Sequence, residues 1–188
     1  MRREGRIPTE TLPTATDRLV FRTWLAQDWP LALALWGDAR VSALIGGPFS
    51  ENQVRERLET ELARQRQHGV QYWPIFFKDG GEHLGCCGLK PYDLPAGIFE
   101  LGFQLLAEQW GKGVATEAAR AVIDHAFGPL SAAALFAGHH PQNFGSRRVL
   151  EKLGFRYTHD ELYLATGLQH RSYRLTLNEY KRPAASPG

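Results

Sequence analysis

The sequence has few of the features that mark secreted, membrane-spanning or nucleic-acid-binding proteins. Its only cysteines, Cys86 and Cys87, are adjacent, so they offer neither a disulfide framework nor a metal-ligand spacing. No run approaches the ~20 apolar residues of a membrane helix, and residues 1–17 lack the apolar core of a secretory signal. The net charge is only +2, and the basic residues are dispersed, which gives no support for a nucleic-acid or membrane partner. We therefore expect a cytoplasmic protein.

Length and composition instead predict one globular domain with loose ends. A chain of 188 residues, of which 43% are hydrophobic and 22% charged, can bury a sizeable core. The polar, proline-containing ends at residues 1–16 and 183–188 are predicted to be flexible tails, which leaves 17–182 as the domain.

Local patterns predict elements in the order β α α β β β α β α β β. Asp28 can cap a first helix that has Pro30 just inside it. Ser50 and Gln53 form a capping-box pattern at the start of a long helix, which Gly69 ends. Strands are expected at residues 18–24, 72–77, 82–89, 98–106, 133–138, 156–164 and 171–176, and two more helices at 116–127 and after Asn143. Early hairpins and one parallel crossover favour an α/β protein with a mixed sheet and helices on its faces.

A glycine-rich loop carries the clearest chemical signal. Gly111-Lys112-Gly113 lies between an apolar strand candidate and a helix, where backbone N–H groups and the helix dipole favour an anion. A phosphate-bearing ligand is therefore expected, and a tight turn without a ligand is the alternative. The loop lacks the pattern of a nucleotide-triphosphate site, because Gly113-Val114 follow Lys112. It also lacks the third glycine of a dinucleotide fingerprint, because Thr116 stands there.

This loop and four other segments resemble the GNAT superfamily of N-acetyltransferases. The family consensus for acyl-CoA binding is Gln/Arg-x-x-Gly-x-Gly/Ala, whose last two positions match Gly113 and Ala115, while Trp110 departs from the first. That tryptophan resembles the branch that acetylates ribosomal-protein N-termini, where YWGKGYATEA-like segments are usual. The other similar segments are residues 16–24, 100–103, 143–155 and 170–173, so the resemblance spans about residues 16–181.

The resemblance implies a GNAT fold and acetyl-CoA as cosubstrate, with no metal. In that fold a mixed, mostly antiparallel sheet of six to seven strands has helices on both faces. Its fourth and fifth strands splay apart, and the pantetheine arm pairs with their exposed edges. A backbone N–H near Leu106 would polarise the thioester carbonyl. The residues implied to contact the coenzyme are Leu106, Gly111, Lys112, Gly113, Val114, Ala115, Thr116, Asn143, Ser146 and Arg147.

The resemblance also implies two catalytic residues. Acetyl transfer to an amine needs a base, and Glu100 matches a position where some family members place theirs. A carboxylate that only binds substrate, with a water relay as base, is the alternative. Ser146 matches the residue near the coenzyme sulfur and could protonate the thiolate, although it could also be an ordinary first-turn serine. Asn143 can cap its helix and also touch the pantetheine.

Several charged and histidine residues are weaker candidates. Arg147 and Arg148 lie near a helix N-terminus, where the coenzyme 3′-phosphate would offset their unfavourable position, or they are simply solvated. His139, His140 and His170 lack a metal-ligand spacing, so no metal is expected. His140 remains a candidate for substrate contact. Residues 36–49 are expected to wall the acceptor pocket, as in the resembling family.

The predicted function is transfer of an acetyl group from acetyl-CoA to a primary amine by direct attack in a ternary complex. A protein N-terminus is the usual acceptor of the resembling branch, and small amines or aminoglycosides are alternatives. Asp93, Glu100 and Glu108 are a thin acidic basis for an aminoglycoside site. A catalytically silent acyl-CoA-binding module is the alternative class. The acceptor, the strict identity of the acyl group and the oligomeric state, with a homodimer among the options, are left open.

Overall fold

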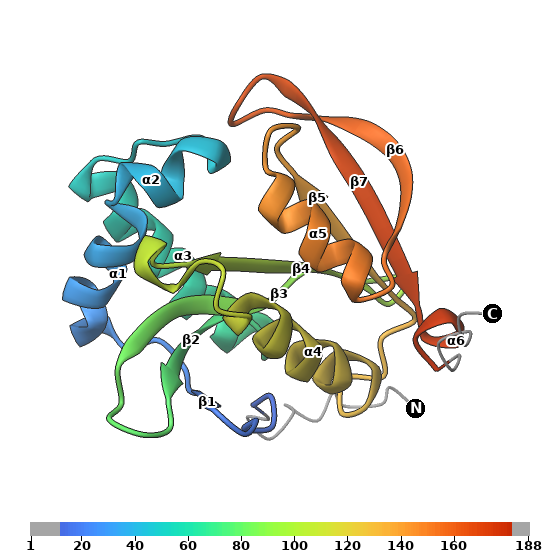
Figure 1. Cartoon of the computed structure of the whole chain (residues 1–188), viewed down its shortest axis with the longest axis horizontal. Helices are drawn as coiled ribbons and strands as arrows, with labels where there is room; N and C mark the ends of the chain where they lie inside the picture. Colours follow the sequence, from blue (N-terminus) through green and yellow to red (C-terminus); the bar gives the residue numbers. More distant parts are fainter. Residues whose placement is uncertain (1–11, 182–188) are drawn as a thin grey trace, which may run out of the picture.

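A seven-stranded mixed sheet organises the chain (Figure 1). The computed structural model describes residues 12–181, so the predicted tails lie outside the described residues, apart from 12–16. The strand order is β1-β2-β3-β4-β5-β7-β6, and all neighbours are antiparallel except the parallel pair β4 and β5. The strands are β1 Leu19–Phe21, β2 Tyr72–Phe77, β3 His83–Asp93, β4 Ile98–Leu105, β5 Ala134–His139, β6 Arg156–Tyr163 and β7 Leu168–Thr176. The expected mixed, mostly antiparallel sheet is confirmed.

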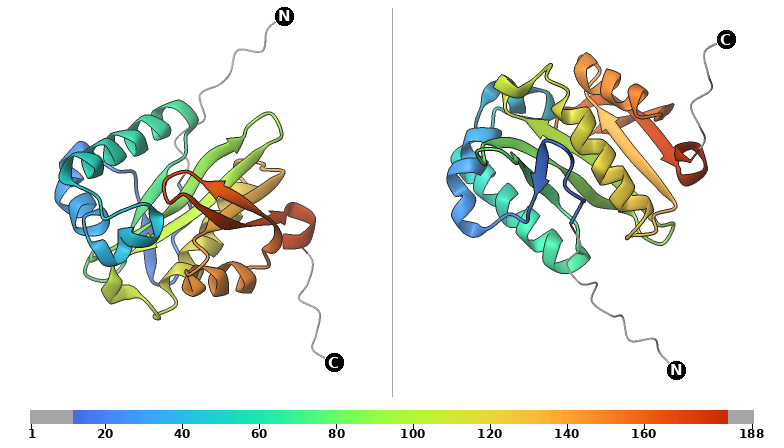
Figure 2. Two further views of the ribbon diagram at one scale, coloured as in Figure 1. Left: turned by 90° about the horizontal axis from the view of Figure 1, so that it is seen from above. Right: turned by 60° about the horizontal axis from the view of Figure 1, so that its bottom comes forward.

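Helices cover both faces of this sheet, as Figure 2 shows for α3 and α4. The helices are α1 Trp29–Trp36, α2 Ala39–Ser42, α3 Glu51–His68, α4 Val114–Phe127, α5 Phe144–Lys152 and α6 Leu177–Tyr180, with short 3-10 turns η1 Ala26–Asp28, η2 Ala43–Ile45 and η3 Ala107–Gln109. Successive strand residues face opposite sides, so Tyr72 and Cys86 pack with α1–α3, whereas Trp73 and Cys87 pack with α4. No helix within residues 12–181 has the length and apolar character needed to cross a membrane.

Most of the local start and stop signals act as predicted. Ser50 and Gln53 form the reciprocal capping box of α3, and Gly69 ends that helix with a φ of 68°. Asn143 caps α5, and Gly154 follows that helix with a φ of 89°. These signals depend only on neighbouring residues, so the tertiary environment leaves them unchanged.

The role predicted for Asp28 is wrong. Helix α1 begins directly after it, but the carboxylate makes no capping hydrogen bond. Asp28 Oδ2 instead accepts hydrogen bonds from the Leu25 N–H at 2.8 Å and from Arg22 Nη1 at 2.6 Å. An arginine on a neighbouring segment therefore takes the carboxylate away from the helix.

Some element boundaries also differ from the prediction. Strand β3 extends to Asp93 rather than residue 89, and α4 begins at Val114 rather than residue 116. Helices α2 and α6 were not predicted, because four residues are too few for a periodic pattern.

The parallel pair β4 and β5 opens after three residues. Ile98, Phe99 and Glu100 pair with Ala134, Leu135 and Phe136, and the pairing ends there. The remainder of β4 continues beside β3 alone. The implied splay between the fourth and fifth strands is therefore present, and it opens toward the N-termini of α4 and α5 (Figure 1).

Candidate functional site

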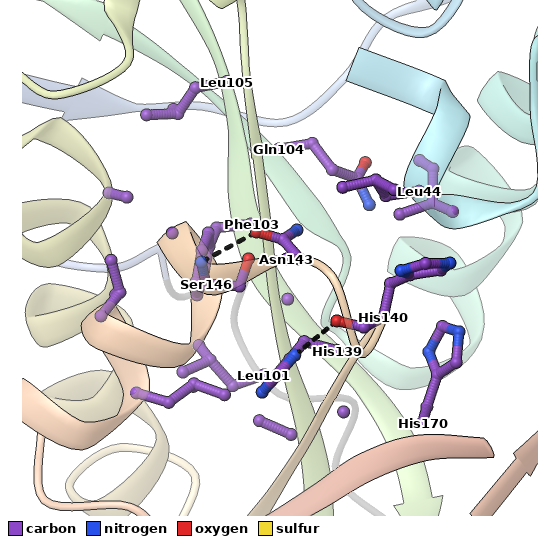
Figure 3. A pocket seen from close by; sticks show the side chains of 18 of the residues that line it. Leu44, Leu101, Phe103, Gln104, Leu105, His139, His140, Asn143, Ser146 and His170 are labelled. Carbon is purple, nitrogen blue, oxygen red and sulfur yellow. Dashed lines mark hydrogen bonds between the residues drawn. The ribbon is translucent and has the colours of Figure 1, made fainter. Parts of the chain in front are cut away.

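A cavity of about 920 Å³ lies where β4 and β5 separate (Figure 3). Its loop end is lined by Gly111, residues 113–116 and 143–146, and Arg148. Its hairpin end is lined by Arg40, Val41, Leu44, Ile45, Arg57, Tyr72, Lys90, Tyr92, Glu100 and residues 161–163 of the β6–β7 hairpin. The predicted site residues that line the cavity are Glu100, Gly111, Gly113, Val114, Ala115, Thr116, Asn143 and Ser146; Leu106, Lys112 and Arg147 do not.

The glycine loop presents backbone donors to the loop end of the cavity. Gly111 and Gly113 have φ angles of 76° and 78°, which favour glycine, and Gly113 is the N-cap of α4. No side chain caps α4, so its first N–H groups are available to a ligand. Arg18 stabilises the loop, because its guanidinium donates a hydrogen bond to the Lys112 carbonyl at 3.3 Å. The Lys112 ammonium itself turns aside and donates to Gln109 Oε1 at 3.3 Å.

The first turn of α5 supplies the facing wall of the loop end. Asn143 Oδ1 accepts the Ser146 N–H at 2.9 Å, and both side chains line the cavity (Figure 3). Of the two neighbouring arginines, Arg148 lines the cavity. Arg147 Nε instead donates to Glu151 Oε1 at 2.8 Å, one helical turn on. The coenzyme contact expected of Arg147 is therefore not supported by its position, whereas Arg148 lies where such a contact could form.

A backbone donor was expected near Leu106, but the N–H of Leu106 itself bonds within the sheet. The Leu106 N–H donates to the Leu84 carbonyl of the β3 side at 2.9 Å, so it is not free for a ligand. Donors alternate between the two edges of a strand, so the N–H groups of Phe103 and Leu105 point to the opened β5 side. The Leu105 carbonyl accepts the Trp110 indole N–H at 3.0 Å. Trp110 thus ties the glycine loop to the end of β4.

Glu100 lies on β4 where the strands separate, and its side chain is 20% exposed. Its Oε2 lies 3.0 Å from Lys90 Nζ of the facing strand β3. Its Oε1 accepts the Tyr72 hydroxyl at 3.5 Å. Burial and then the Glu100 charge hold the Tyr72 pKa well above its ordinary value, so this hydroxyl stays protonated and remains a donor. A Cβ on Gly102 would lie 2.5 Å from the Tyr72 hydroxyl oxygen, so only glycine there leaves room for this tyrosine.

The three histidines noted in the sequence lie together beside the cavity. His139 Nδ1 lies 2.7 Å from the His140 carbonyl, so Nδ1 carries the proton and Nε2 can accept the Tyr173 hydroxyl at 3.4 Å. His140 and His170 meet edge to face with ring centres 5.4 Å apart. Burial lowers the pKa of His139 and of His170. Across residues 12–181 no group of three or more His, Cys, Asp or Glu could hold a metal ion.

Two cavity-lining side chains, Arg57 of the hairpin end and Gln104 of β4, were missed by the sequence analysis. Gln104 Oε1 accepts the Trp36 indole N–H at 2.7 Å and Arg57 Nη2 at 3.2 Å. Figure 3 shows the Gln104 side chain directed toward Leu44. The sequence does hold a signal for Arg57, because it falls on the buried stripe of α3 that includes Val54. An arginine at a helix position that faces the core is uncommon and calls for a partner.

Comparison with known proteins identifies the class of this protein. Residues 18–156 match the family described as "Acetyltransferase (GNAT) domain", so the chain belongs to the GNAT family of acetyltransferases. YkkB of Bacillus subtilis (strain 168) is 32% identical over 145 residues, covering 76% of this chain and 84% of YkkB. N-acetyltransferase p20 of Bacillus licheniformis is 29% identical over 143 residues, covering 75% of this chain and 80% of p20.

Solved structures support the same assignment. An acetyltransferase from Agrobacterium tumefaciens strain C58 is 27% identical, with a TM-score of 0.75, over 92% of this chain and 98% of the other. RimL, a ribosomal L7/L12 alpha-N-protein acetyltransferase, has a TM-score of 0.75 at 13% identity over 88% and 93% of the chains, which shows a shared fold. The resemblance to GNAT enzymes is therefore confirmed.

The loop end suits the cosubstrate that GNAT enzymes use, acetyl-CoA. Uncapped N–H groups at the start of α4 match a pyrophosphate. The unpaired edges of β4 and β5 match an extended amide-bearing arm. Both features belong to this chain's own backbone, so the fit does not depend on the family assignment.

Proposed function

We propose that this acetyltransferase moves the acetyl group of acetyl-CoA to the nitrogen of a primary amine that enters at the hairpin end. One observation carries the proposal. A single cavity connects the uncapped start of α4 with Glu100, and it passes through the gap between β4 and β5. A donor bound at the loop end and an amine bound at the hairpin end would therefore meet beside one carboxylate.

The side chains and backbone groups suit direct transfer. Glu100 would take a proton from the ammonium group, which frees the nitrogen lone pair to attack the thioester carbonyl carbon. The N–H groups of Phe103 and Leu105 face the gap and would stabilise the oxyanion. As the C–N bond forms, the C–S bond breaks. The nitrogen must also give up its second proton in this step. The thiolate would take a proton from the Ser146 hydroxyl, and the proton released by the nitrogen would restore that hydroxyl through water, which leaves the amide, the thiol and one proton on Glu100.

An acyl-enzyme route finds little support in the cysteines. Cys86 and Cys87 are fully buried and do not line the cavity. Burial raises the pKa of both thiols, so neither forms the thiolate that would act as a nucleophile. We therefore favour attack by the amine itself in a ternary complex.

The charges of the hairpin end disfavour a polycationic acceptor such as an aminoglycoside. Of the two carboxylates that line it, Glu100 already pairs with Lys90, and Glu161 lies 3.7 Å from His159. Arg40 is paired with Asp38 and Glu108, and Arg57 adds a cation that has no carboxylate partner among residues 12–181. A singly charged amine fits this balance better.

A panel assay tests the proposal. Thiol release from acetyl-CoA is followed with N-terminal peptides, amino acids and small amines, and products are identified by mass spectrometry. We expect amine-dependent release with an N-acetylated product. Tight acetyl-CoA binding without transfer to any amine in the panel would contradict the proposal and favour the silent acyl-CoA-binding module.

A further inference from the structure

Arg57 of α3 is a cation at the hairpin end that lacks an anionic partner. Its guanidinium lies 5.0 Å from the Trp36 ring centre and 5.6 Å from that of Phe49. Nη2 donates to the neutral Gln104 amide, and the buried Nε has no hydrogen-bond partner. Among the ion pairs formed within residues 12–181, none includes Arg57.

Arg64, two turns further along α3, shows the opposite arrangement. It pairs with Glu61 Oε1 at 2.6 Å, so its charge is neutralised. Glu61 is also four residues from Arg57, a spacing that often gives a helical ion pair. Its second oxygen, however, accepts the Tyr72 N–H at 2.8 Å. Both arginines have a buried nitrogen without a hydrogen bond, Arg57 Nε and Arg64 Nη1, so they differ in charge pairing: a carboxylate lies beside Arg64 and, within the described residues, none beside Arg57. A partly buried cation is costly without an anion, so Arg57 is the one that a ligand anion would stabilise.

Arg57 and Glu100 place opposite charges in the same part of the cavity. Tyr72 lies close enough to respond to both: burial and Glu100 raise the pKa of its hydroxyl, and the Arg57 charge opposes that rise. The hairpin end thus contains a carboxylate suited to an ammonium group and a guanidinium suited to an anion. A ligand that carries both groups would satisfy both side chains at once.

On the basis of the proposed function, we propose that the acceptor is a small amine that also carries a carboxylate, such as a free amino acid, and that Arg57 binds this carboxylate. A planar guanidinium can donate two parallel hydrogen bonds to a carboxylate, which fixes orientation as well as charge. The packing against Trp36 and Phe49 restrains the group before binding. With the carboxylate held at Arg57, the amine is directed toward Glu100.

The closure of the hairpin end favours a small acceptor over a protein N-terminus. A Cβ on Gly46 would lie 2.9 Å from the Ala165 Cβ, so the β6–β7 turn touches the segment after η2. This contact joins the two walls beyond the cavity, as the approach of the β6–β7 tip to α2 in Figure 1 illustrates. Val41, Leu44 and Ile45 supply apolar surface there for the side chain of an amino acid.

The test compares each L-amino acid with its C-terminal amide as acceptor for the full-length protein. The amide lacks the negative charge of the acid but has nearly the same shape. Its amine is less basic, so a larger fraction of it is unprotonated at neutral pH. A preference for the acid therefore cannot come from amine protonation. We expect at least one amino acid to be used with a kcat/KM about 100-fold above that of its amide.

Variants assign that preference to Arg57. Arg57→Gln should bring the acid-to-amide ratio close to one, mainly by raising KM for the acid, and Arg57→Lys should give an intermediate ratio. Arg55→Gln is the matched control, since Arg55 lies on the same helix, stacks 4.3 Å from the Trp29 ring centre and does not line the cavity. It should keep the wild-type ratio. Melting temperatures verify that each variant is folded.

The outcomes separate this inference from the proposed function. Equal use of acids and amides by the wild type, or an unchanged ratio in folded Arg57→Gln and Arg57→Lys, would overturn the role of Arg57. Acetylation of peptide N-termini alone would overturn the carboxylate-bearing acceptor and leave the proposed function standing. Turnover of no amine at all would overturn both.

Discussion

The two ends of the cavity are built in different ways. The loop end consists mainly of backbone N–H groups from one continuous segment, residues 111–116, with the first turn of α5 beside it. The hairpin end consists of side chains from α2, η2, α3, β2, β3, β4 and β6, which lie far apart in the sequence. A local pattern can specify the first kind of site, whereas the second exists only once the whole sheet has formed.

This difference separates the two substrates. On the proposed function, the site made of backbone groups would bind what the reactions of the family share, the pyrophosphate and amide groups of the coenzyme. A site made of side chains can change its acceptor by single substitutions and leave the donor site intact. Substitutions at the loop end should therefore act on acetyl-CoA, and those at the hairpin end on the amine.

The largest effect is expected at Glu100, where the two ends meet. Glu100→Gln keeps the shape of the side chain but removes the base, so kcat should fall by about 10²- to 10⁴-fold. The variant should also lose the limb of the pH–rate profile that reports the base, while acetyl-CoA affinity measured by calorimetry should not change. Glu59→Gln, on the exposed side of α3, is the control. A pH–rate profile of unchanged shape would remove Glu100 from this role.

His83 does not line either end of the cavity, but it should make the stability of the protein depend on pH. Activity measurements at the two ends must therefore be made at a pH where the protein remains folded. Burial lowers its pKa from 6.5 to about 4 in the folded protein. Between pH 6.5 and 4, His83 is protonated in the unfolded chain but neutral in the folded protein. The free energy of unfolding therefore falls as the pH drops from 6.5 toward 4. The loss attributable to this histidine should reach about 3 kcal/mol at pH 4.

His83→Gln should flatten that part of the stability curve, as measured by urea unfolding at pH 7 and pH 5. His68→Gln is a suitable control, because His68 is exposed at the end of α3. An identical pH dependence in the wild type and His83→Gln would contradict the burial argument.

At the loop end, Gly113→Ala should raise KM for acetyl-CoA about tenfold. In alanine a φ of 78° costs about 1 kcal/mol or more relative to glycine. The backbone should therefore shift at residue 113 and move the N–H donors at the start of α4. Gly69→Ala is matched to it, since Gly69 has a φ of 68° and open space around it but ends α3. The two variants should lose similar stability, and only Gly113→Ala should weaken acetyl-CoA. If Gly113→Ala and Gly69→Ala had the same KM for acetyl-CoA, the loop would not be the coenzyme site.

The smallest effect is expected at Arg148. Arg148→Ala should weaken coenzyme A about threefold more than dephospho-coenzyme A, because an exposed ion pair contributes less than about 1 kcal/mol. Arg147→Ala should leave the affinities for both ligands unchanged, since Arg147 pairs with Glu151 instead of lining the cavity. Equal losses in Arg148→Ala would exclude a contact with the 3′-phosphate.

The sequence predicts the loop end better than the hairpin end, for a physical reason. The glycine loop, the Asn143 cap and the α3 capping box depend on residues a few positions apart, and they are present as expected. The Leu106 N–H proved to be bonded to the Leu84 carbonyl, which the sequence could not show because strand patterns do not reveal which edge each N–H faces. Arg147 was chosen with Arg148 because the rotation of α5 is invisible without its packing.

The hairpin end could not be predicted, because its chemistry comes from long-range encounters. Arg57 meets Gln104 across 47 positions, and Tyr72 meets Glu100 across 28. Glu61 has the right spacing to pair with Arg57, but in the structure its two oxygens contact the Tyr72 N–H and Arg64. The sequence alone does not show that Arg57 lacks an ion partner in the described part of the chain.

The most direct test of the two-ended site measures KM for acetyl-CoA and KM for the acceptor on the same preparations of wild type, Gly113→Ala and Arg57→Gln. The account predicts that Gly113→Ala raises KM for acetyl-CoA alone and that Arg57→Gln raises KM for the acceptor alone. An Arg57→Gln variant that raises KM for acetyl-CoA as much as KM for the acceptor would contradict it, as would a Gly113→Ala variant with unchanged acetyl-CoA binding.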